Sequence, residues 1–229
     1  PGTRLGAPEI AIAASAGLAR LAVSRLPRIA VISTGDELVE PGLPILDHQI
    51  RRSNSHGLAA ALTLAGFAPA TDRHLPDDAA ELERALGLEL DRNDVLVLSG
   101  GVSAGRFDHV PAALAALGVR KVFHQVAQRP GRPLWFGTRA PGRLVFALPG
   151  NPVSVLVCLA RYVIPALAAL SGVRAPARPM ATTSSISWCR SEVACGYFMR
   201  PASGGTTGRT ASAGLVKKNG GSFVASPPI

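Results

Sequence analysis

The stretch Ser99-Gly100-Gly101-Val102-Ser103-Ala104-Gly105-Arg106-Phe107-Asp108 decides how this chain folds, because it follows a strand-like run and ends on a carboxylate. The run before it, Asp94 to Leu98, is apolar and rich in β-branched residues, as is typical of a strand buried on both faces. The glycines allow a sharp turn that brings backbone N–H groups close to a ligand, and Ser103 adds a hydroxyl donor. Asp108 precedes a predicted helix over residues 110–117, where a carboxylate either caps the helix or binds a divalent metal.

Two further loops repeat this pattern. Arg28 to Ser33 predicts a second buried strand, which runs into Thr34-Gly35-Asp36-Glu37 and so places two adjacent carboxylates at its end. Leu144 to Leu148 predicts a third, which is followed by Pro149-Gly150-Asn151-Pro152 and a long apolar helix. Because ligands of open α/β sheets bind at the carboxyl ends of the strands, the three loops predict one crevice.

The whole segment from Arg28 to Gly172 alternates predicted strands with predicted helices. Helices are expected over residues 9–22, 54–65 and 79–90, and further strands over 67–71, 121–126 and 133–137. This alternation predicts a three-layer α/β/α domain whose mostly parallel sheet is covered by helices on both faces. We therefore expect a linker and helix at 1–26, the α/β domain at 27–172, and a β-rich or partly disordered segment at 173–229.

Composition narrows the class of ligand. The 229 residues carry a formal charge of +9, and most of the excess lies beyond residue 170. The chain has only two Tyr and two Trp and no Lys/Arg run longer than two, which argues against a nucleic-acid surface and favours a small anionic ligand. Three cysteines without a Cys-x-x-Cys spacing fit a reduced cytoplasm better than a disulfide framework.

No membrane association is expected. Pro1 to Arg28 lacks the order of basic, apolar and small residues that marks a signal peptide. Pro152 to Leu170 is nearly all apolar, but Arg161 lies at its middle and Pro165 is expected to break its last turns, so a buried core helix is favoured over a membrane span.

Carboxylates and arginines supply the candidate chemistry. Asp36-Glu37, Asp77-Asp78 and Asp108 offer hard oxygen ligands suited to Mg²⁺, although Asp77 and Asp78 could equally cap the following helix and Glu37 could lie in a solvated loop. In Arg129-Pro130-Gly131-Arg132-Pro133, two guanidinium groups flank a rigid turn and could clamp a tetrahedral oxyanion, with Ser154 as a further donor; a solvated basic turn is the alternative.

Three motifs together carry a family resemblance. STGDEL (33–38), SGGVSAGRFD (99–108) and LPGNPVS (148–154), in this order and at these separations, resemble the molybdopterin molybdenumtransferases, the family of MoeA and the gephyrin E domain. The resemblance covers residues 1–172 and implies a molybdopterin-binding fold of the MoaB/Mog type. It also implies a cytoplasmic enzyme of molybdenum cofactor biosynthesis, a homodimer at full length, that inserts molybdate into the dithiolene of adenylylated molybdopterin with release of AMP. Residues 1–26 would then belong with a preceding domain.

The resemblance also implies roles for individual positions. It assigns Glu37, Asp77 and Asp108 to the catalytic crevice, with Glu37 and Asp108 as Mg²⁺ ligands, and it assigns molybdate to Arg129, Arg132 and Ser154. The substrate-binding positions that it implies are Thr34, Gly35, Asn54, Gly100, Gly101, Ser103, Gly105, Pro149, Gly150, Asn151 and Pro152.

The chain departs from the family at several places. The family usually has lysine at one or both of the positions of Arg129 and Arg132, and a fork-shaped guanidinium replaces a mobile point charge there. Arg52 stands before Ser53-Asn54 where an acidic residue is more common, which bears on nucleotide binding by Asn54. Residues 173–229 do not match the family's C-terminal β domain, and Arg200 is the one molybdate-binding candidate in them.

Two other functions remain open from the sequence. The chain could be a non-catalytic molybdopterin-binding fragment or scaffold module, which would bind the pterin nucleotide without inserting molybdenum. It could also be a molybdopterin adenylyltransferase, although the LPGNPVS and RPGRP segments argue against that. Ser103 has no neighbouring His in the sequence, so covalent catalysis is not expected.

Overall fold

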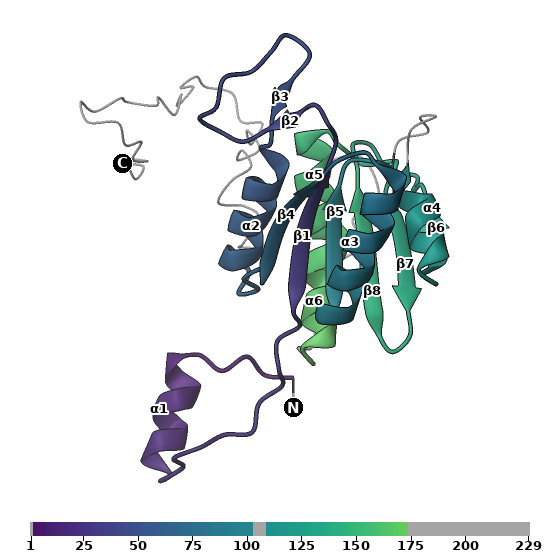
Figure 1. The fold of residues 1–229 in the computed structure, drawn as a ribbon. Coiled ribbons are helices and arrows are strands. Elements are labelled where there is room, and N and C mark those ends of the chain that lie inside the picture. Colours follow the sequence, from purple (N-terminus) through teal and green to yellow (C-terminus); the bar gives the residue numbers. More distant parts are fainter. Residues whose placement is uncertain (1, 103–108, 174–229) are drawn as a thin grey trace, which may run out of the picture.

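The computed structural model describes residues 2–102 and 109–173, and in them a six-stranded sheet lies between two layers of helices (Figure 1). In their order across the sheet the strands are β4 (Thr71–Leu75), β1 (Ile29–Thr34), β5 (Val95–Ser99), β8 (Arg143–Leu148), β7 (Trp135–Arg139) and β6 (Arg120–His124). The first four are parallel to one another, whereas β7 runs antiparallel to β8 and β6 runs antiparallel to β7. The expected mostly parallel α/β/α fold is therefore confirmed, with an antiparallel pair at one edge.

The central strands are in register. Ile29 of β1 pairs with Val95 of β5, and Val95 pairs in turn with Leu144 of β8. Every residue of β1 and β5 is buried, as their apolar sequences predict. Because the three strands start level, they also end level, so the loops that carry the sequence motifs emerge side by side.

Helices cover both faces of this sheet (Figure 1). They are α2 (Asn54–Leu64), α5 (Pro152–Cys158), η1 (Leu159–Val163) and α6 (Ile164–Leu170) on one face, and α3 (Ala79–Arg92) and α4 (His109–Ala116) on the other. Alternate residues of β1 face the two layers: Ile29 and Val31 pack with α2 and α5, whereas Ala30 and Ile32 pack with α3 and α4.

Two predicted elements lie elsewhere in the structure. The strand expected at 67–71 is β4, at Thr71–Leu75; Phe67 instead is buried in the core on the α2 side. The apolar signal misled because β4 is a largely exposed edge strand of polar residues. The helix expected at 9–22 is only α1 (Ala7–Ser15), since Gly17, with φ of +79°, reverses the chain behind its last turn. α1 buries none of its residues and stands apart from the sheet (Figure 1).

The expectation that Pro165 breaks the last turns of the long helix is wrong, because α6 continues through it to Leu170. A π turn, η1, precedes it, in which the Ile164 N–H donates to the Leu159 carbonyl five residues back. α6 follows this turn without a break and has Pro165 in its first turn, where proline is tolerated. Within the parts of the chain that the structure describes, Pro152–Leu170 is the one helix long and apolar enough to cross a membrane, a test that core helices also pass. Here Val155, Val163 and Leu167 are buried against the sheet.

The loop between β1 and α2 contains a short parallel pair that no sequence pattern predicted, β2 (Leu38–Val39) and β3 (Ile50–Arg51). Arg52, at its end, is buried; its Nε donates to Ser33 Oγ at 3.2 Å, and its guanidinium pairs with Glu40 and Asp72. The hydrogen bond from Arg52 holds the pKa of Glu40 below its usual value. Arg52 therefore fastens this loop to β1 and β4, which gives it a structural role at the position where the family more often has an acidic residue.

Asp94 joins three segments at the opposite, amino edge of the sheet. Its carboxylate accepts hydrogen bonds from Arg25 Nη1 at 2.8 Å, from the Arg28 N–H at 2.8 Å and from Arg143 Nη1 at 2.9 Å. The bond from Arg25 is the largest of the influences that hold the pKa of Asp94 below its usual value. The ionised carboxylate therefore ties the segment before β1 and the start of β8 to β5.

We expect Asp94→Asn to lower the free energy of unfolding by about 2 kcal/mol at pH 7, because hydrogen bonds to a charged group are lost. A carboxyl with a depressed pKa stabilises the fold fully above its unfolded pKa of about 3.9, and that contribution is lost as the pH falls through the lower, folded value. Urea unfolding from pH 7 to pH 3 should show the two proteins converging below pH ~4. Asp47→Asn, at an exposed position, is the control; a constant difference at all pH values would contradict this assignment.

Candidate functional site

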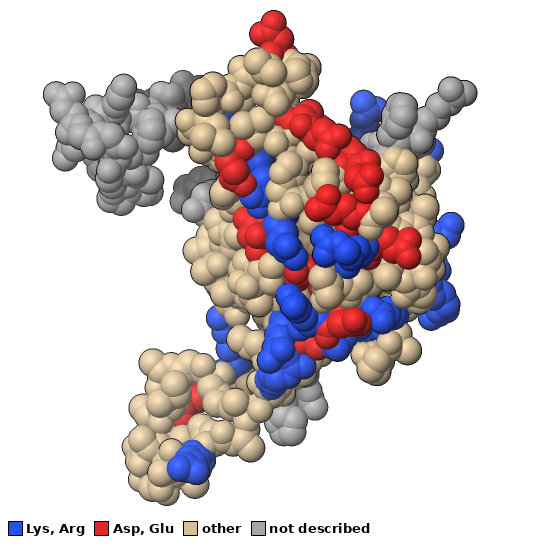
Figure 2. All heavy atoms as spheres, viewed as in Figure 1, with Lys and Arg blue, Asp and Glu red and all other residues tan. Residues whose placement is uncertain are grey.

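The loops that carry the sequence motifs meet at the carboxyl edge of the sheet. β4, β1, β5 and β8 are parallel, and β6 points the same way because two antiparallel pairings separate it from β8. Along this edge the strand order places the acidic loops after β4 and β1 first, then the glycine loop after β5, then Pro149–Pro152 after β8, and last the basic loop after β6. Figure 2 shows acidic side chains gathered over the end of β1 and the start of α3.

The glycine loop packs directly on the end of β1. Gly100 and Gly101 have φ of +99° and +65°, and a Cβ on Gly100 would lie 2.7 Å from the Thr34 carbonyl oxygen. A Cβ on Gly101 would lie 2.6 Å from Val110 Cγ2 and 3.0 Å from Thr34 Oγ1. Glycine is thus required by both conformation and space. The Thr34 hydroxyl is buried and has no hydrogen-bond partner among residues 2–102 and 109–173, so a donor or acceptor remains at this edge of the sheet.

Asn54, the first residue of α2, connects the second and third motif loops. Its Nδ2 donates to Ser99 Oγ at 2.9 Å and to the Gly150 carbonyl at 2.7 Å. Its Oδ1 and the hydroxyl of the adjacent Ser55 are buried, and neither has a partner in the part of the chain that the structure describes. Since buried polar groups are normally satisfied, these atoms of Thr34, Asn54 and Ser55 are available to hydrogen-bond a polar ligand.

The acidic loops lie in contact. Asp36 Oδ1 accepts a hydrogen bond from the Asp77 N–H at 3.0 Å, and the Glu37 carboxylate lies where a Cβ of Gly35 would be. Asp78 caps α3 by accepting from the Glu81 N–H at 2.8 Å, so the capping alternative is confirmed for Asp78. No group of three or more His, Cys, Asp or Glu side chains forms a metal cage in residues 2–102 and 109–173.

The loop after β8 begins the long helix. Asn151 caps α5 by accepting from the Ser154 N–H at 3.1 Å, and the Ser154 hydroxyl donates to the same Asn151 oxygen at 3.4 Å. Ser154 is buried, whereas Gly150, Asn151 and Pro152 are exposed. The exposed turn can therefore contact a ligand. The Ser154 N–H and hydroxyl both bond the capping oxygen of Asn151 and do not point to a molybdate site.

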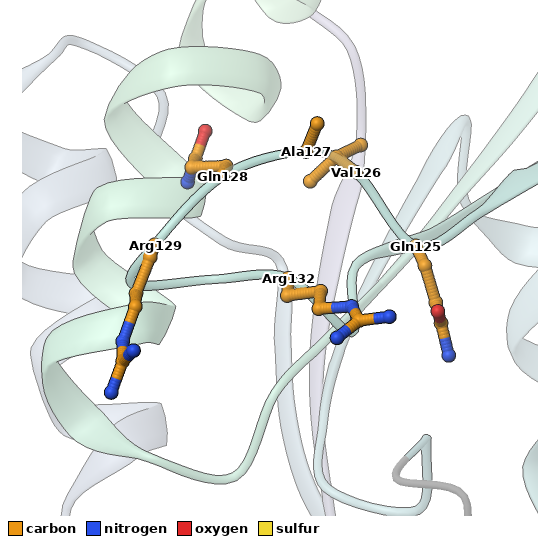
Figure 3. Close-up of a pocket in the computed structure, with 6 residues that line it drawn as sticks. All are labelled: Gln125, Val126, Ala127, Gln128, Arg129 and Arg132. Atoms are coloured by element: carbon orange, nitrogen blue, oxygen red, sulfur yellow. The ribbon is translucent and has the colours of Figure 1, made fainter.

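The basic loop lines a pocket of about 550 Å³ (Figure 3). Its lining residues are Gln125, Val126, Ala127, Gln128, Arg129 and Arg132. Both arginines are exposed, and Figure 3 shows their side chains extending in different directions from the loop. The paired clamp on one oxyanion therefore stays a prediction that needs at least one arginine to change rotamer.

The structure brings most of the predicted site residues to this one edge: Thr34, Gly35, Glu37, Asn54, Asp77, Gly100, Gly101, Arg129, Arg132, Pro149, Gly150, Asn151, Pro152 and Ser154. Ser103, Gly105 and Asp108 lie outside the described residues, as does Arg200. The sequence did not single out Ser55, Gln128 or Tyr162, because none belongs to a recognisable motif.

Known proteins resemble this chain over the same region. Residues 30–169 match the family described as "Probable molybdopterin binding domain". A molybdopterin molybdenumtransferase of Synechocystis is 43% identical over 161 residues, covering 70% of this chain and 41% of that protein. The molybdopterin molybdenumtransferase 2 of Mycobacterium tuberculosis is 39% identical, covering 74% and 43%.

Among solved structures, a molybdopterin biosynthesis MoeA protein of Pyrococcus horikoshii aligns with a TM-score of 0.64 and 32% identity. The alignment covers 75% of this chain and 42% of that one. The chain thus spans about two fifths of the length of the relatives that it matches.

Proposed function

This chain belongs to the family described as "Probable molybdopterin binding domain", and from that premise we propose that the loops at the carboxyl edge of its sheet bind adenylylated molybdopterin and molybdate. We propose further that it inserts molybdenum into the pterin dithiolene with cleavage of the phosphoanhydride and release of AMP. It would then be a molybdopterin molybdenumtransferase, as its relatives are named, and would act in molybdenum cofactor biosynthesis.

The order of the loops along the carboxyl edge carries this proposal. Carboxylates after β1 and β4 lie at one end, arginines after β6 lie at the other, and the glycine loop with the orphaned polar atoms of Thr34, Asn54 and Ser55 lies between them. A substrate with a phosphoanhydride and a dithiolene needs a metal near its phosphates and an oxyanion near its sulfur atoms. The arrangement supports such a substrate lying along the edge with its phosphates toward the carboxylates.

Magnesium is the metal that we propose. Mg²⁺ is usually held by one or two carboxylates together with substrate phosphates rather than by a full protein cage. The contact between the Asp36 and Asp77 loops supports such a limited donor set, and Glu37 follows Asp36 in the same loop, with its carboxylate against Gly35. We propose Glu37 and Asp108 as ligands and Asp77 as a further carboxylate of the crevice; Mg²⁺, when bound, would offset the charge of the phosphates.

A binding-only function is the second candidate. The chain spans about two fifths of the length of its relatives, so groups that those proteins use for turnover can lie outside it. In that case the crevice would bind the pterin nucleotide without inserting molybdenum.

We also propose that residues 27–172 form the binding domain, with 1–26 and 173–229 as separate segments, and that the full-length protein is a cytoplasmic homodimer. Ile10 and Ile12 of α1 are exposed, which supports the proposal that residues 1–26 pack against a surface other than this sheet.

We expect the chain, given adenylylated molybdopterin, molybdate and Mg²⁺, to release AMP and incorporate molybdenum in equal amounts. Glu37→Gln and Asp108→Asn should each lower turnover by about a hundredfold, because a metal-held phosphate loses charge compensation. AMP is measured by mass-resolved chromatography and molybdenum by elemental mass spectrometry, with Glu83→Gln, at an exposed position on α3, as the matched control.

Other outcomes would redirect the proposal. Tight binding of the pterin nucleotide without AMP release would establish the binding-only function. Formation of adenylylated molybdopterin from ATP and molybdopterin would establish adenylyl transfer instead. Turnover that is equal in Glu37→Gln, Asp108→Asn and the wild type would exclude both carboxylates from the reaction.

A further inference from the structure

The side chain of Gln128 links the basic loop to the long helix. The Tyr162 hydroxyl, in the π turn η1, donates to Gln128 Oε1 at 2.8 Å, and Gln128 Nε2 donates to the Pro130 carbonyl at 2.7 Å. Gln128 therefore connects the helix to the backbone between Arg129 and Arg132. In Figure 3 Gln128 lies beside the green helix, Arg129 points down from the loop and Arg132 extends toward the side of Gln125.

A second contact fixes the same turn. Gly131 is buried at φ of +105°, and a Cβ there would lie 2.7 Å from Cys158 Sγ and 2.7 Å from Gln128 Nε2. The Cys158 thiol donates to the Gly131 carbonyl at 3.7 Å. Burial raises the pKa of Cys158 to about 11, so the thiol is neutral at pH 7 and can act as this donor. The turn thus packs on the helix without room for a side chain.

The π turn supplies the anchor. π turns interrupt α-helices at few places and are frequent at functional sites. In this helix the interruption covers Leu159–Val163 and includes Tyr162, while Leu159 and Val163 remain buried in the core. The helix therefore keeps its core contacts through Leu159 and Val163 and presents the Tyr162 hydroxyl to the loop.

We propose that Gln128 and Tyr162 are positioning residues that hold the Arg129–Arg132 backbone in the form that binds a tetrahedral oxyanion. This inference rests on the proposed function, since molybdate is the oxyanion. Two long, exposed arginine side chains lose conformational entropy on binding, and a loop that is already fixed leaves only the rotamers to be ordered. Neither residue touches the ligand; both act through the backbone of the turn.

The test compares single-group deletions. Tyr162→Phe removes only the hydroxyl, and Gln128→Leu removes the hydrogen bonds of the linking side chain to Tyr162, Pro130 and Cys158. Ser171→Ala is the matched control. Ser171 follows the last residue of α6, its hydroxyl donates to the Leu167 carbonyl, and within the described residues no hydrogen bond joins it to the basic loop. Sodium molybdate is the probe, and its affinity is measured by equilibrium dialysis on the whole chain.

We expect Tyr162→Phe and Gln128→Leu to weaken molybdate binding by about threefold to tenfold, as for the loss of one or two hydrogen bonds. The double variant should be no weaker than Gln128→Leu alone, because both act through one link. Affinity for the pterin nucleotide should stay at the wild-type value. Amide hydrogen exchange in the peptide spanning residues 125–134 should become faster in both variants but not in Ser171→Ala.

The failures are distinguishable. If the wild type binds molybdate and loses it on Arg129→Gln, but Tyr162→Phe and Gln128→Leu match Ser171→Ala in affinity and exchange, the positioning role is overturned and the proposed function stands. If the wild type binds no molybdate at all, the proposed function itself fails. An equal loss of pterin and molybdate affinity would mark a general loss of structure and would also overturn the positioning role.

Discussion

Gly100→Ala is expected to lower the free energy of unfolding by about 3 kcal/mol, since it combines a strained left-handed backbone with a core overlap. The φ of +99° is one that side chains rarely adopt, and the new Cβ would lie 2.7 Å from the Thr34 carbonyl oxygen. That oxygen belongs to the backbone and cannot rotate away. The ends of β1 and β5 must therefore separate, and we expect binding of the pterin nucleotide to be lost with them.

Gly118→Ala is the matched control for this variant. Gly118 has a φ of +73°, but a Cβ there meets nothing within 4 Å, so it carries the backbone strain without the overlap. We expect Gly118→Ala to lower the free energy of unfolding by about 1 kcal/mol and to leave binding of the pterin nucleotide unchanged. Urea unfolding and fluorescence titration with the pterin nucleotide measure both effects. Equal stability of the two variants would show that the glycine loop does not pack on Thr34 as described.

Replacing both Arg129 and Arg132 by glutamine is expected to weaken molybdate binding by at least about a hundredfold, because each charge-assisted hydrogen bond contributes roughly 1.5–3 kcal/mol. Both side chains are exposed, so the fold should be unaffected. Binding to the wild type should also weaken as salt is added, because the attraction is between exposed charges.

The lysine pair at the same positions separates charge from geometry. Arg129→Lys with Arg132→Lys keeps both charges and loses the planar forks, so we expect a loss of about tenfold or less. Equilibrium dialysis of molybdate measures all three proteins, and Arg84→Gln, exposed on α3, is the control. An undiminished affinity in the glutamine pair would place molybdate elsewhere in the crevice.

The three motifs predicted the family correctly, and the matches to molybdopterin molybdenumtransferases confirm the resemblance. The positions of β1, β5 and β8 were also predicted to within a residue, because a strand buried on both faces leaves an unbroken apolar run. The prediction of strands failed where the strand residues are largely exposed. β4 is a polar edge strand, and β2 and β3 are strands of two residues each, too short to leave a pattern in the sequence.

Residues that act at a distance along the chain were the hardest to identify. Asn54 could be named as a site residue from its motif, but its bonds to Ser99 and Gly150 join segments 45 and 96 residues away. Arg52 looked like a change that affects the nucleotide and is instead buried against Ser33 with Glu40 and Asp72. Such pairings depend on how strands are ordered in the sheet, which no local pattern records.

The sequence by itself determined the α/β architecture, the family and the loops in which the chemistry lies, because apolar periodicity and glycine placement are local properties of the chain. Only the tertiary structure decided the order of those loops along the carboxyl edge, with carboxylates at one end and arginines at the other. It also decided that Tyr162 reaches Gln128 across 34 residues. The physical reason is that strand order and helix packing come from burying the whole sheet at once, and that burial brings together side chains whose separation in sequence carries no signal.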